Sequence, residues 1–291
     1  MDFVDELDGQ ISLTRNDGTP LVLRSTAFTV DTTINGNNKS FYDVLVRDPS
    51  GNETNITSTI NGGTLKGYLE MRDTVVVEVL DKLDRLAAGF VKEFNNIHQQ
   101  GFGLDGSTGN NFFNPLETNV DANANNSGST ALTATNGDPS NISIDKYEIT
   151  ITGETSFSLQ NETRGASSGT YTFTSGSTFN IGNGFAVTIS GTPVVGDKFK
   201  LSVSEGAARN ISIANNVSSN TSKISAGLNS RTDGGNAQNL VGLQSKALFD
   251  NITLDSAGSG TFTFDEFYSS LIRTVGIQSA SSQATFAQQE G

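Results

Sequence analysis

His98 is the only histidine in this sequence, and its imidazole is the side chain best suited to acid–base or metal chemistry near neutral pH. One imidazole cannot form a two-histidine metal site, and a catalytic triad would have to be built around this one position. His98 falls at the end of a predicted helix, where a cation is mildly favoured. We therefore predict a structural role for His98, with no catalytic residue and no metal ligand.

The acidic residues offer two further chemistries, and both patterns are weak. Residues 121–125 begin like a calcium-binding loop, but the sixth position is Asn126 rather than Gly and the twelfth is Leu132 rather than Glu. Carboxylates for glycoside hydrolysis could come from Glu154, Glu162 and Glu205, which are predicted at strand ends in a polar region. A solvated surface explains them better, so we expect no metal site, no cofactor and no enzymatic activity.

Arg72 and Asp73 form an adjacent charged pair on the longest predicted helix. Adjacent residues on a helix point in different directions, so each should contact another element rather than its neighbour. We predict that Arg72 forms an ion pair with the segment 1–61 or with a neighbouring subunit. The alternative is a charge pair that is simply solvated.

The overall composition excludes several classes of partner. Eighteen basic and thirty-one acidic residues give a net charge of −13, which disfavours nucleic-acid binding. No apolar run is long enough to span a membrane, and the N-terminus has no basic and apolar regions typical of a cleaved secretory signal. The absence of cysteine excludes disulfides and thiolate-bound zinc.

The pattern of apolar residues predicts a discontinuous α+β architecture. Residues 1–61 alternate as strands, and residues 64–99 carry apolar side chains at heptad spacing, which is typical of a long helix needing partner helices. Strand alternation with frequent turns returns from 101 to 205, with an Asn- and Ser-rich surface loop expected at 119–136. Thr263 and Glu266 have the spacing of a capping box that starts a second long helix.

We therefore expect a long-helix bundle domain with an associated β segment, interrupted by an inserted antiparallel β domain. The helical domain comprises residues 1–103 and 206–291, and the β-rich outer domain comprises 104–205. The residues predicted to pack the helices together are Leu69, Val76, Leu83, Phe90, Phe94, Phe267 and Leu271.

Several motifs, in order, resemble the FlgK family of flagellar hook-associated proteins. The segment 67–73 is similar to the family's Gly-Leu-Arg-Asp element at the start of its long central helix, and residues 94–113 resemble the end of that helix. The segment 191–199 matches a late-strand pattern, and 264–276 matches the closing helices. The similarity extends from about residue 8 to 286, without the family's N-terminal helices and C-terminal coiled coil. The chain is therefore expected to be an internal fragment.

The resemblance implies a structural subunit of the junction ring between the flagellar hook and filament. It implies extracellular localisation after export by the flagellar secretion apparatus without a cleaved signal. The implied partners are neighbouring copies of the same protein, the hook protein, the second junction protein and an export chaperone that binds the missing C-terminal segment. Nucleic acid and membranes are not expected as partners. The alternative function is a surface adhesin or carbohydrate-binding β module on a helical stalk, which should expose clustered aromatic residues.

Overall fold

The computed structural model describes residues 2–5, 11–14, 18, 20–23, 26–250 and 261–290. The chain forms two compact units, residues 1–77 and 78–291. Long helices and several antiparallel sheets occur in the same chain, which confirms the predicted α+β class. The proposed division of the chain at residues 104 and 205 stays a prediction.

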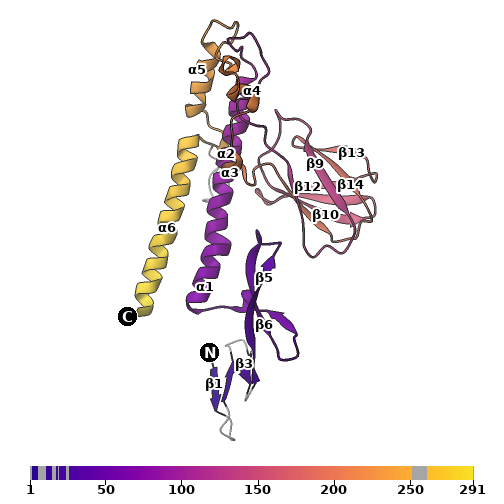
Figure 1. Cartoon of the computed structure of the whole chain (residues 1–291), viewed down its shortest axis with the longest axis vertical. Coiled ribbons are helices and arrows are strands. Elements are labelled where there is room, and N and C mark those ends of the chain that lie inside the picture. Colours follow the sequence, from indigo (N-terminus) through magenta and orange to yellow (C-terminus); the bar gives the residue numbers. More distant parts are fainter. Residues whose placement is uncertain are drawn as a thin grey trace. The chain divides into compact units, whose positions relative to one another are not determined.

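The first unit contains two antiparallel sheets and the start of the long helix (Figure 1). One sheet pairs β1 (Asp2–Asp5), β2 (Ile11–Thr14), β3 (Pro20–Leu23) and β4 (Thr26–Ala27) in that order. The other pairs β5 (Thr29–Asn35), β6 (Phe41–Arg47) and β7 (Glu53–Asn55), and is followed by the short helix η1 (Thr57–Thr59). A small apolar core joins this second sheet to the helix, and it consists of Val44, Val46, Ile56, Ile60 and Leu69.

Helical structure is continuous in sequence from residue 63 to 98, close to the predicted 64–99. It comprises α1 (Gly63–Glu70), a π-helical segment η2 (Met71–Val76) and α2 (Val77–His98). A π helix bonds residue i to i+5 and therefore holds about one residue more per turn than an α helix. Each α-helical residue turns the chain by roughly 100°, so the side chains that follow are displaced around the axis.

This displacement separates two residues that were expected on one face. Leu69 is 7% exposed and lies in the core of the first unit, whereas Val76, seven residues later, is 40% exposed. In an unbroken α helix the two would point almost the same way. The structure therefore departs from the expected packing at Val76, because the heptad spacing takes no account of the π segment between them.

The second unit contains a sandwich of two antiparallel sheets. The strands are β8 (Asn119–Ala122), β9 (Ala131–Asn136), β10 (Tyr147–Gly153), β11 (Ser156–Asn161), β12 (Ala166–Thr172), β13 (Thr178–Gly182), β14 (Phe185–Ser190) and β15 (Lys198–Ser202). They pair in the orders β12-β11-β10-β15-β8 and β13-β14-β9. Their inward side chains form one core that includes Ile149, Phe157, Phe185 and Leu201. The prediction of a surface loop at 119–136 was wrong, because β8 and β9 lie there and pair with β15 and β14, respectively.

The remainder of the second unit is mainly helical. It comprises α3 (Ala207–Asn210), α4 (Asn215–Ser218), η3 (Thr221–Lys223), α5 (Gly235–Gly242), η4 (Leu243–Ser245), the strand pair β16 (Phe249–Asp250) and β17 (Thr261–Phe262), and α6 (Phe264–Glu290). The predicted capping box is confirmed at the start of α6. There, the backbone N–H of Glu266 donates to Thr263 Oγ1 at 3.3 Å, and that of Thr263 donates to Glu266 Oε2 at 2.9 Å.

Within this unit, the sandwich lies to one side of α2 and α6 begins on the other side (Figure 1). The rings of Phe90 on α2 and Phe264 on α6 are 5.6 Å apart, centroid to centroid. α2 also buries charged and polar residues, including Asp84, Arg85, Asn95 and His98. The predicted apolar stripe at Leu83, Phe90 and Phe94 is only half-buried. The helix is thus covered on more than one side.

Candidate functional site

Arg72 is anchored within the first unit at the π-helical segment. Its Nη1 atom donates to the backbone carbonyl of Tyr42 at 2.7 Å, and its guanidinium lies 5.3 Å from the ring centroid of Phe41. Arg72 thus contacts the segment 1–61 through a hydrogen bond to a backbone carbonyl rather than through the predicted ion pair. Arg72 also contacts its neighbour, with Nε 2.5 Å from Asp73 Oδ1. We did not expect this contact, because adjacent residues on a regular helix point in different directions. This pair raises the pKa of Arg72 and lowers that of Asp73, so both stay charged.

A polar cavity of about 450 Å³ lies beside this anchor in the first unit. Its most buried acid is Asp43, whose Oδ2 accepts hydrogen bonds from Asn35 Nδ2 at 3.0 Å and Asn55 Nδ2 at 2.6 Å. These amides satisfy the carboxylate without a cation. No cluster of three or more potential metal ligands occurs among the residues whose positions are described.

His98 is fully buried at the C-terminal end of α2. Its Nε2 atom lies 2.9 Å from the backbone nitrogen of Ser225, and its Nδ1 atom lies 2.7 Å from the carbonyl oxygen of Asn110. A backbone N–H can only donate, so Nε2 accepts and the proton lies on Nδ1, which donates to Asn110. Burial lowers the pKa of His98, which favours this neutral form. Both ring nitrogens are occupied by backbone groups, so neither is available to a substrate or metal.

Two buried asparagines hold the same helix end, and the sequence analysis did not identify them as functional. Asn95 Oδ1 accepts from the backbone N–H groups of Phe112 and Phe113 at 3.0 and 2.9 Å. Asn236 Nδ2 donates to the carbonyls of Ile97 at 3.1 Å and Ser225 at 2.7 Å. Asn95 lies in the helix whose apolar residues recur at heptad spacing. A polar residue that this spacing does not explain is the one feature of the sequence that could have drawn attention to Asn95. Asn236 gives no such signal, because its partners are 139 and 11 residues away.

Charged residues of α2 also contact the connection before β10 and the segment where the chain leaves the sandwich. Asp84 accepts from the backbone N–H groups of Gly206 at 2.9 Å and Ala208 at 3.0 Å. Arg85 Nη2 lies 3.5 Å from Asp145 Oδ1, and both side chains are less than a tenth exposed. Lys146 Nζ lies 2.7 Å from Asp81 Oδ1. Buried charges are tolerated only when paired in this way, so these contacts fix α2 against residues 145–146 and 206–208.

Glu154 and Glu162, two of the three carboxylates considered for hydrolysis, do not form a pair. Glu154 lies in the turn between β10 and β11, and Glu162 lies in the turn between β11 and β12. The six residues of β11 separate these turns by about 20 Å, well beyond the roughly 5–10 Å that glycosidase carboxylates require. Glu162 pairs with Lys200 at 3.3 Å, and Glu205 follows β15. Asp121, from the calcium-like segment, lies in β8 opposite Lys200.

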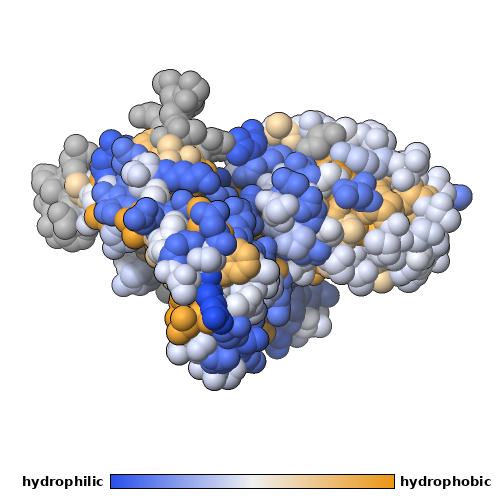
Figure 2. All heavy atoms as spheres, turned by 90° about the horizontal axis from the view of Figure 1, so that it is seen from above, coloured by the Kyte–Doolittle hydropathy of each residue, from blue (hydrophilic) through white to orange (hydrophobic). Residues whose placement is uncertain are grey.

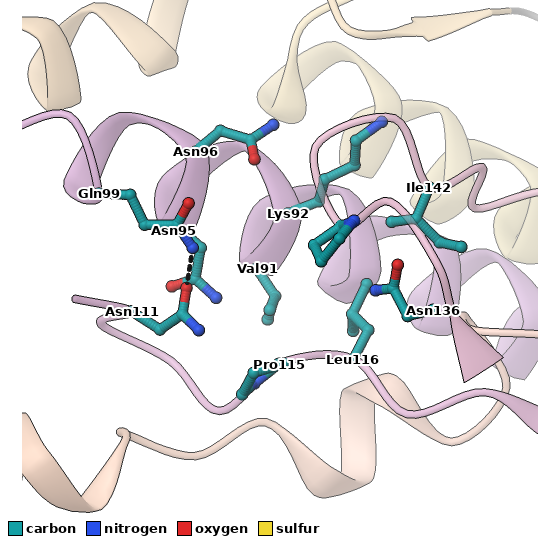
Figure 3. A pocket seen from close by; sticks show the side chains of 11 residues that line it. Val91, Lys92, Asn95, Asn96, Gln99, Asn111, Pro115, Leu116, Asn136 and Ile142 are labelled. Carbon is teal, nitrogen blue, oxygen red and sulfur yellow. Dashed lines mark hydrogen bonds between the residues drawn. The ribbon is translucent and has the colours of Figure 1, made fainter. Parts of the chain in front are cut away.

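A second, smaller cavity of about 90 Å³ lies between α2 and the loops next to the sandwich (Figure 3). Figure 3 shows Val91, Leu116 and Ile142 toward it, with Asn95 and Gln99 at one end. Pockets for small molecules are typically about 300–1,000 Å³, so this space could hold a few water molecules but not an organic ligand.

The remaining candidate surface is the outward side of α6. Tyr268, Ile272 and Val275 are 47%, 52% and 39% exposed, and they follow one another at intervals of four and three residues. An adjacent side of the same helix is buried at Phe267, Ser270, Leu271 and Thr274. Figure 2 shows a mainly hydrophilic face of the molecule with hydrophobic side chains gathered in separate patches. An exposed apolar row at this spacing is typical of a helix that packs against another helix.

The predicted helix-packing residues thus fall into three groups. Leu69, Phe267 and Leu271 are buried, Leu83, Phe90 and Phe94 are half-buried, and Val76 is exposed. Phe90 and Phe94 belong to an aromatic cluster with Phe112 and Phe113, at centroid distances of 5.5 Å or less. Among the helices in the described parts of the chain, none combines the length and hydrophobicity that crossing a bilayer requires.

Comparison with known proteins finds the same kind of relative, flagellar hook-associated proteins, by family model and by sequence. Residues 1–113 match the family model of the flagellar hook-associated protein FlgK helical domain. The chain is 28% identical to flagellar hook-associated protein 1 of Escherichia coli (strain K12) over 283 residues, which is 97% of this chain and 50% of that protein. The corresponding Salmonella typhimurium protein is 28% identical over 273 residues, covering 92% of this chain and 48% of its own length. The chain spans about half the length of the curated relatives it matches.

A solved structure is also similar to this one. The flagellar hook junction protein FlgK from Burkholderia pseudomallei superposes with a TM-score of 0.60 and 26% sequence identity, over 77% of this chain and 41% of that chain. These findings confirm the resemblance inferred from the motifs, and they give no support to the adhesin alternative.

Proposed function

We propose that this FlgK-like chain is part of a structural subunit of the bacterial flagellum that joins the hook to the filament. The observation that carries the proposal is the sequence similarity to flagellar hook-associated protein 1, which extends over 97% of this chain at 28% identity. The similarity to the FlgK structure from Burkholderia pseudomallei supports the same function. The subunit needs no catalytic residue, and the buried polar residues of α2 serve to hold its parts together.

The outward side of α6 supports an assembly role. Tyr268, Ile272 and Val275 form an apolar row of heptad-like spacing, and burying such a row contributes roughly 25 cal/mol per Å². A helix from a neighbouring copy, or from segments of the protein outside this chain, would cover it on assembly. The further partners are the hook protein and the second junction protein, with an export chaperone binding the C-terminal segment outside this chain. The assembled protein lies outside the cell.

Deleting the codons for this segment in the bacterium that encodes it tests the function. Hooks should still assemble, and filament protein should accumulate in the medium because it has nothing to attach to. Electron microscopy counts hooks and filaments, and a plasmid copy of the intact gene should restore attachment. Normal filaments on the deletion strain would refute the junction function.

A further inference from the structure

Four Asn-Gly pairs occur in the sequence, at residues 35–36, 61–62, 136–137 and 183–184. This pair is chemically reactive because glycine has no Cβ, so its backbone nitrogen can approach the preceding carboxamide closely. The nitrogen attacks Cγ, an N–Cγ bond forms, and the Cγ–Nδ2 bond breaks to release ammonia. Water then opens the resulting succinimide at either carbonyl, which leaves aspartate or isoaspartate. No oxidant or enzyme is needed, so the local structure decides which pair reacts.

Two of the pairs are held by hydrogen bonds that oppose this attack. Asn35 donates from Nδ2 to Asp43 Oδ2 at 3.0 Å, and its Oδ1 accepts from the backbone of Asn37 at 2.9 Å, so its carboxamide is fixed. In the pair 136–137 the attacking nitrogen is itself hydrogen-bonded, because the N–H of Gly137 donates to the carbonyl of Gly184 at 2.9 Å. Each attack would first have to break such bonds.

The pair 183–184 is held in a tight turn between β13 and β14. Asn183 and Gly184 both have positive φ, at 54° and 81°, as a two-residue hairpin turn requires. The carbonyl of Asn183 accepts from Ser143 at 2.9 Å, and that of Gly184 accepts from Gly137 at 2.9 Å. Gly184 is also packed tightly, since a Cβ there would lie 2.5 Å from Ile142 Cα. This backbone cannot rotate to bring the nitrogen toward Cγ without disrupting the turn.

The pair 61–62 lacks the hydrogen bonds and the tight turn that restrain the other three pairs. Asn61 and Gly62 are both exposed, in the connection between η1 and α1. Within the described part of the chain, the carboxamide of Asn61 has no hydrogen-bond partner, and it does not cap α1. A Cβ built on Gly62 would meet no atom within 4 Å, so the backbone here has room to move.

We propose that Asn61 is a site of spontaneous deamidation, and the first of the four Asn-Gly pairs to react in the folded protein. The product carries a new negative charge at residue 61. In its isoaspartyl form it also adds one carbon to the main chain between Ile60 and Gly62. Ile60 is 8% exposed and belongs to the core that holds Leu69 of α1. The isoaspartyl form therefore strains the attachment of α1 to the sheet β5-β6-β7.

Peptide mapping by mass spectrometry tests the proposal on the folded 291-residue chain during incubation in mildly alkaline buffer. All four pairs are followed in the same digest, and an unincubated sample corrects for deamidation during digestion. Residue 61 should convert roughly ten-fold or more faster than residues 35 and 136, a barrier difference of about 1.4 kcal/mol. Equal rates at all four pairs, or faster conversion at another pair, would overturn the proposal.

Two controls test whether the local structure, rather than the Asn-Gly sequence itself, sets the deamidation rates. In guanidinium chloride the four pairs should react at similar rates, because each asparagine is followed by glycine and the hydrogen bonds are gone. The substitution Gly62→Ala should slow conversion at residue 61 strongly by hindering the attack. It should leave the fold unchanged, since φ of Gly62 is −164° and its surroundings are open. An unchanged rate in Gly62→Ala, or rate differences that persist in denaturant, would also refute the proposal.

Discussion

His98 and Ser225 are joined by a hydrogen bond across 127 residues of sequence, with 2.9 Å between His98 Nε2 and the backbone nitrogen of Ser225. The bond requires a neutral imidazole whose Nε2 is unprotonated. It connects the end of α2 to the segment after η3, and Asn236 reinforces the same contact by donating to the carbonyl of Ser225. The only histidine of the chain is therefore part of the structure that closes the second unit.

This bond makes stability depend on pH in a defined window. Burial lowers the pKa of His98 in the folded state, while the unfolded state titrates near the ordinary value of about 6.5. The unfolded state thus binds more protons as pH falls below about 6.5, so the free energy of unfolding decreases there and is independent of His98 above it. Urea unfolding at a series of pH values should show this loss.

The substitution His98→Gln provides the control for the pH dependence. Glutamine can donate and accept but does not titrate, so its stability should change less than that of the wild type between about pH 6.5 and 5. Carboxylates titrate at lower pH in both proteins and cancel in the comparison. Identical pH profiles for the two proteins would show that His98 is not the group responsible.

Asp84 should be the most sensitive of the charged residues on α2. The substitution Asp84→Ala removes the buried carboxylate that accepts from the N–H groups of Gly206 and Ala208, and each lost hydrogen bond to a charged group costs about 1.5–3 kcal/mol. Hydrogen exchange at residues 206–208 should rise, and urea unfolding should report the lower stability. Asp121→Ala, at an exposed position of β8, should change stability by less than about 0.5 kcal/mol. Comparable effects of the two substitutions would contradict the proposed contact.

Gly89 tests how closely α2 is packed. A Cβ at this position would lie 2.6 Å from Cζ of Phe249, a buried ring. The gain of about 0.5–1 kcal/mol that alanine usually gives within a helix should be outweighed by about 1–3 kcal/mol of overpacking. Gly89→Ala should therefore lower the thermal midpoint.

Gly276 is the matched position on α6, where a Cβ would meet no atom within 4 Å. Gly276→Ala should raise stability by about 0.5–1 kcal/mol, because only the backbone effect operates. Calorimetry of the two variants should give shifts of opposite sign. A stabilised Gly89→Ala variant would mean that Phe249 moves aside easily.

The apolar row on α6 should matter for assembly rather than for folding. Ile272→Ser in the complete protein should reduce filament attachment, because it removes an exposed apolar contact from the row. In the 291-residue chain the same substitution should change stability by less than about 0.5 kcal/mol. Arg273→Ser, on the exposed adjacent position, is the control and should leave attachment intact. Equal attachment in the two strains would show that this row is not used.

The helices and strands were largely predictable because they depend on local periodicity. The spacing of apolar residues indicated a helix at 64–99, and helical structure occupies 63–98. Alternation identified β10, β11, β14 and β15, whose inward side chains form the sandwich core. It missed β8 and β9, because their Asn-, Ala- and Thr-rich segments carry few apolar side chains and are ordered by pairing with distant strands.

The sequence by itself determined the α+β class, the extent of the long helix, the capping box at Thr263 and the resemblance to hook-associated proteins, since each depends on residues close together in the chain. Only the tertiary structure decided which sides of that helix are buried. Asp84, Asn95 and His98 are polar, so apolar periodicity cannot mark them as interior. They can be buried because their hydrogen-bond partners arrive from residues 206–208, 112–113 and 225. Burial of a polar group depends on partners that folding brings from elsewhere in the chain.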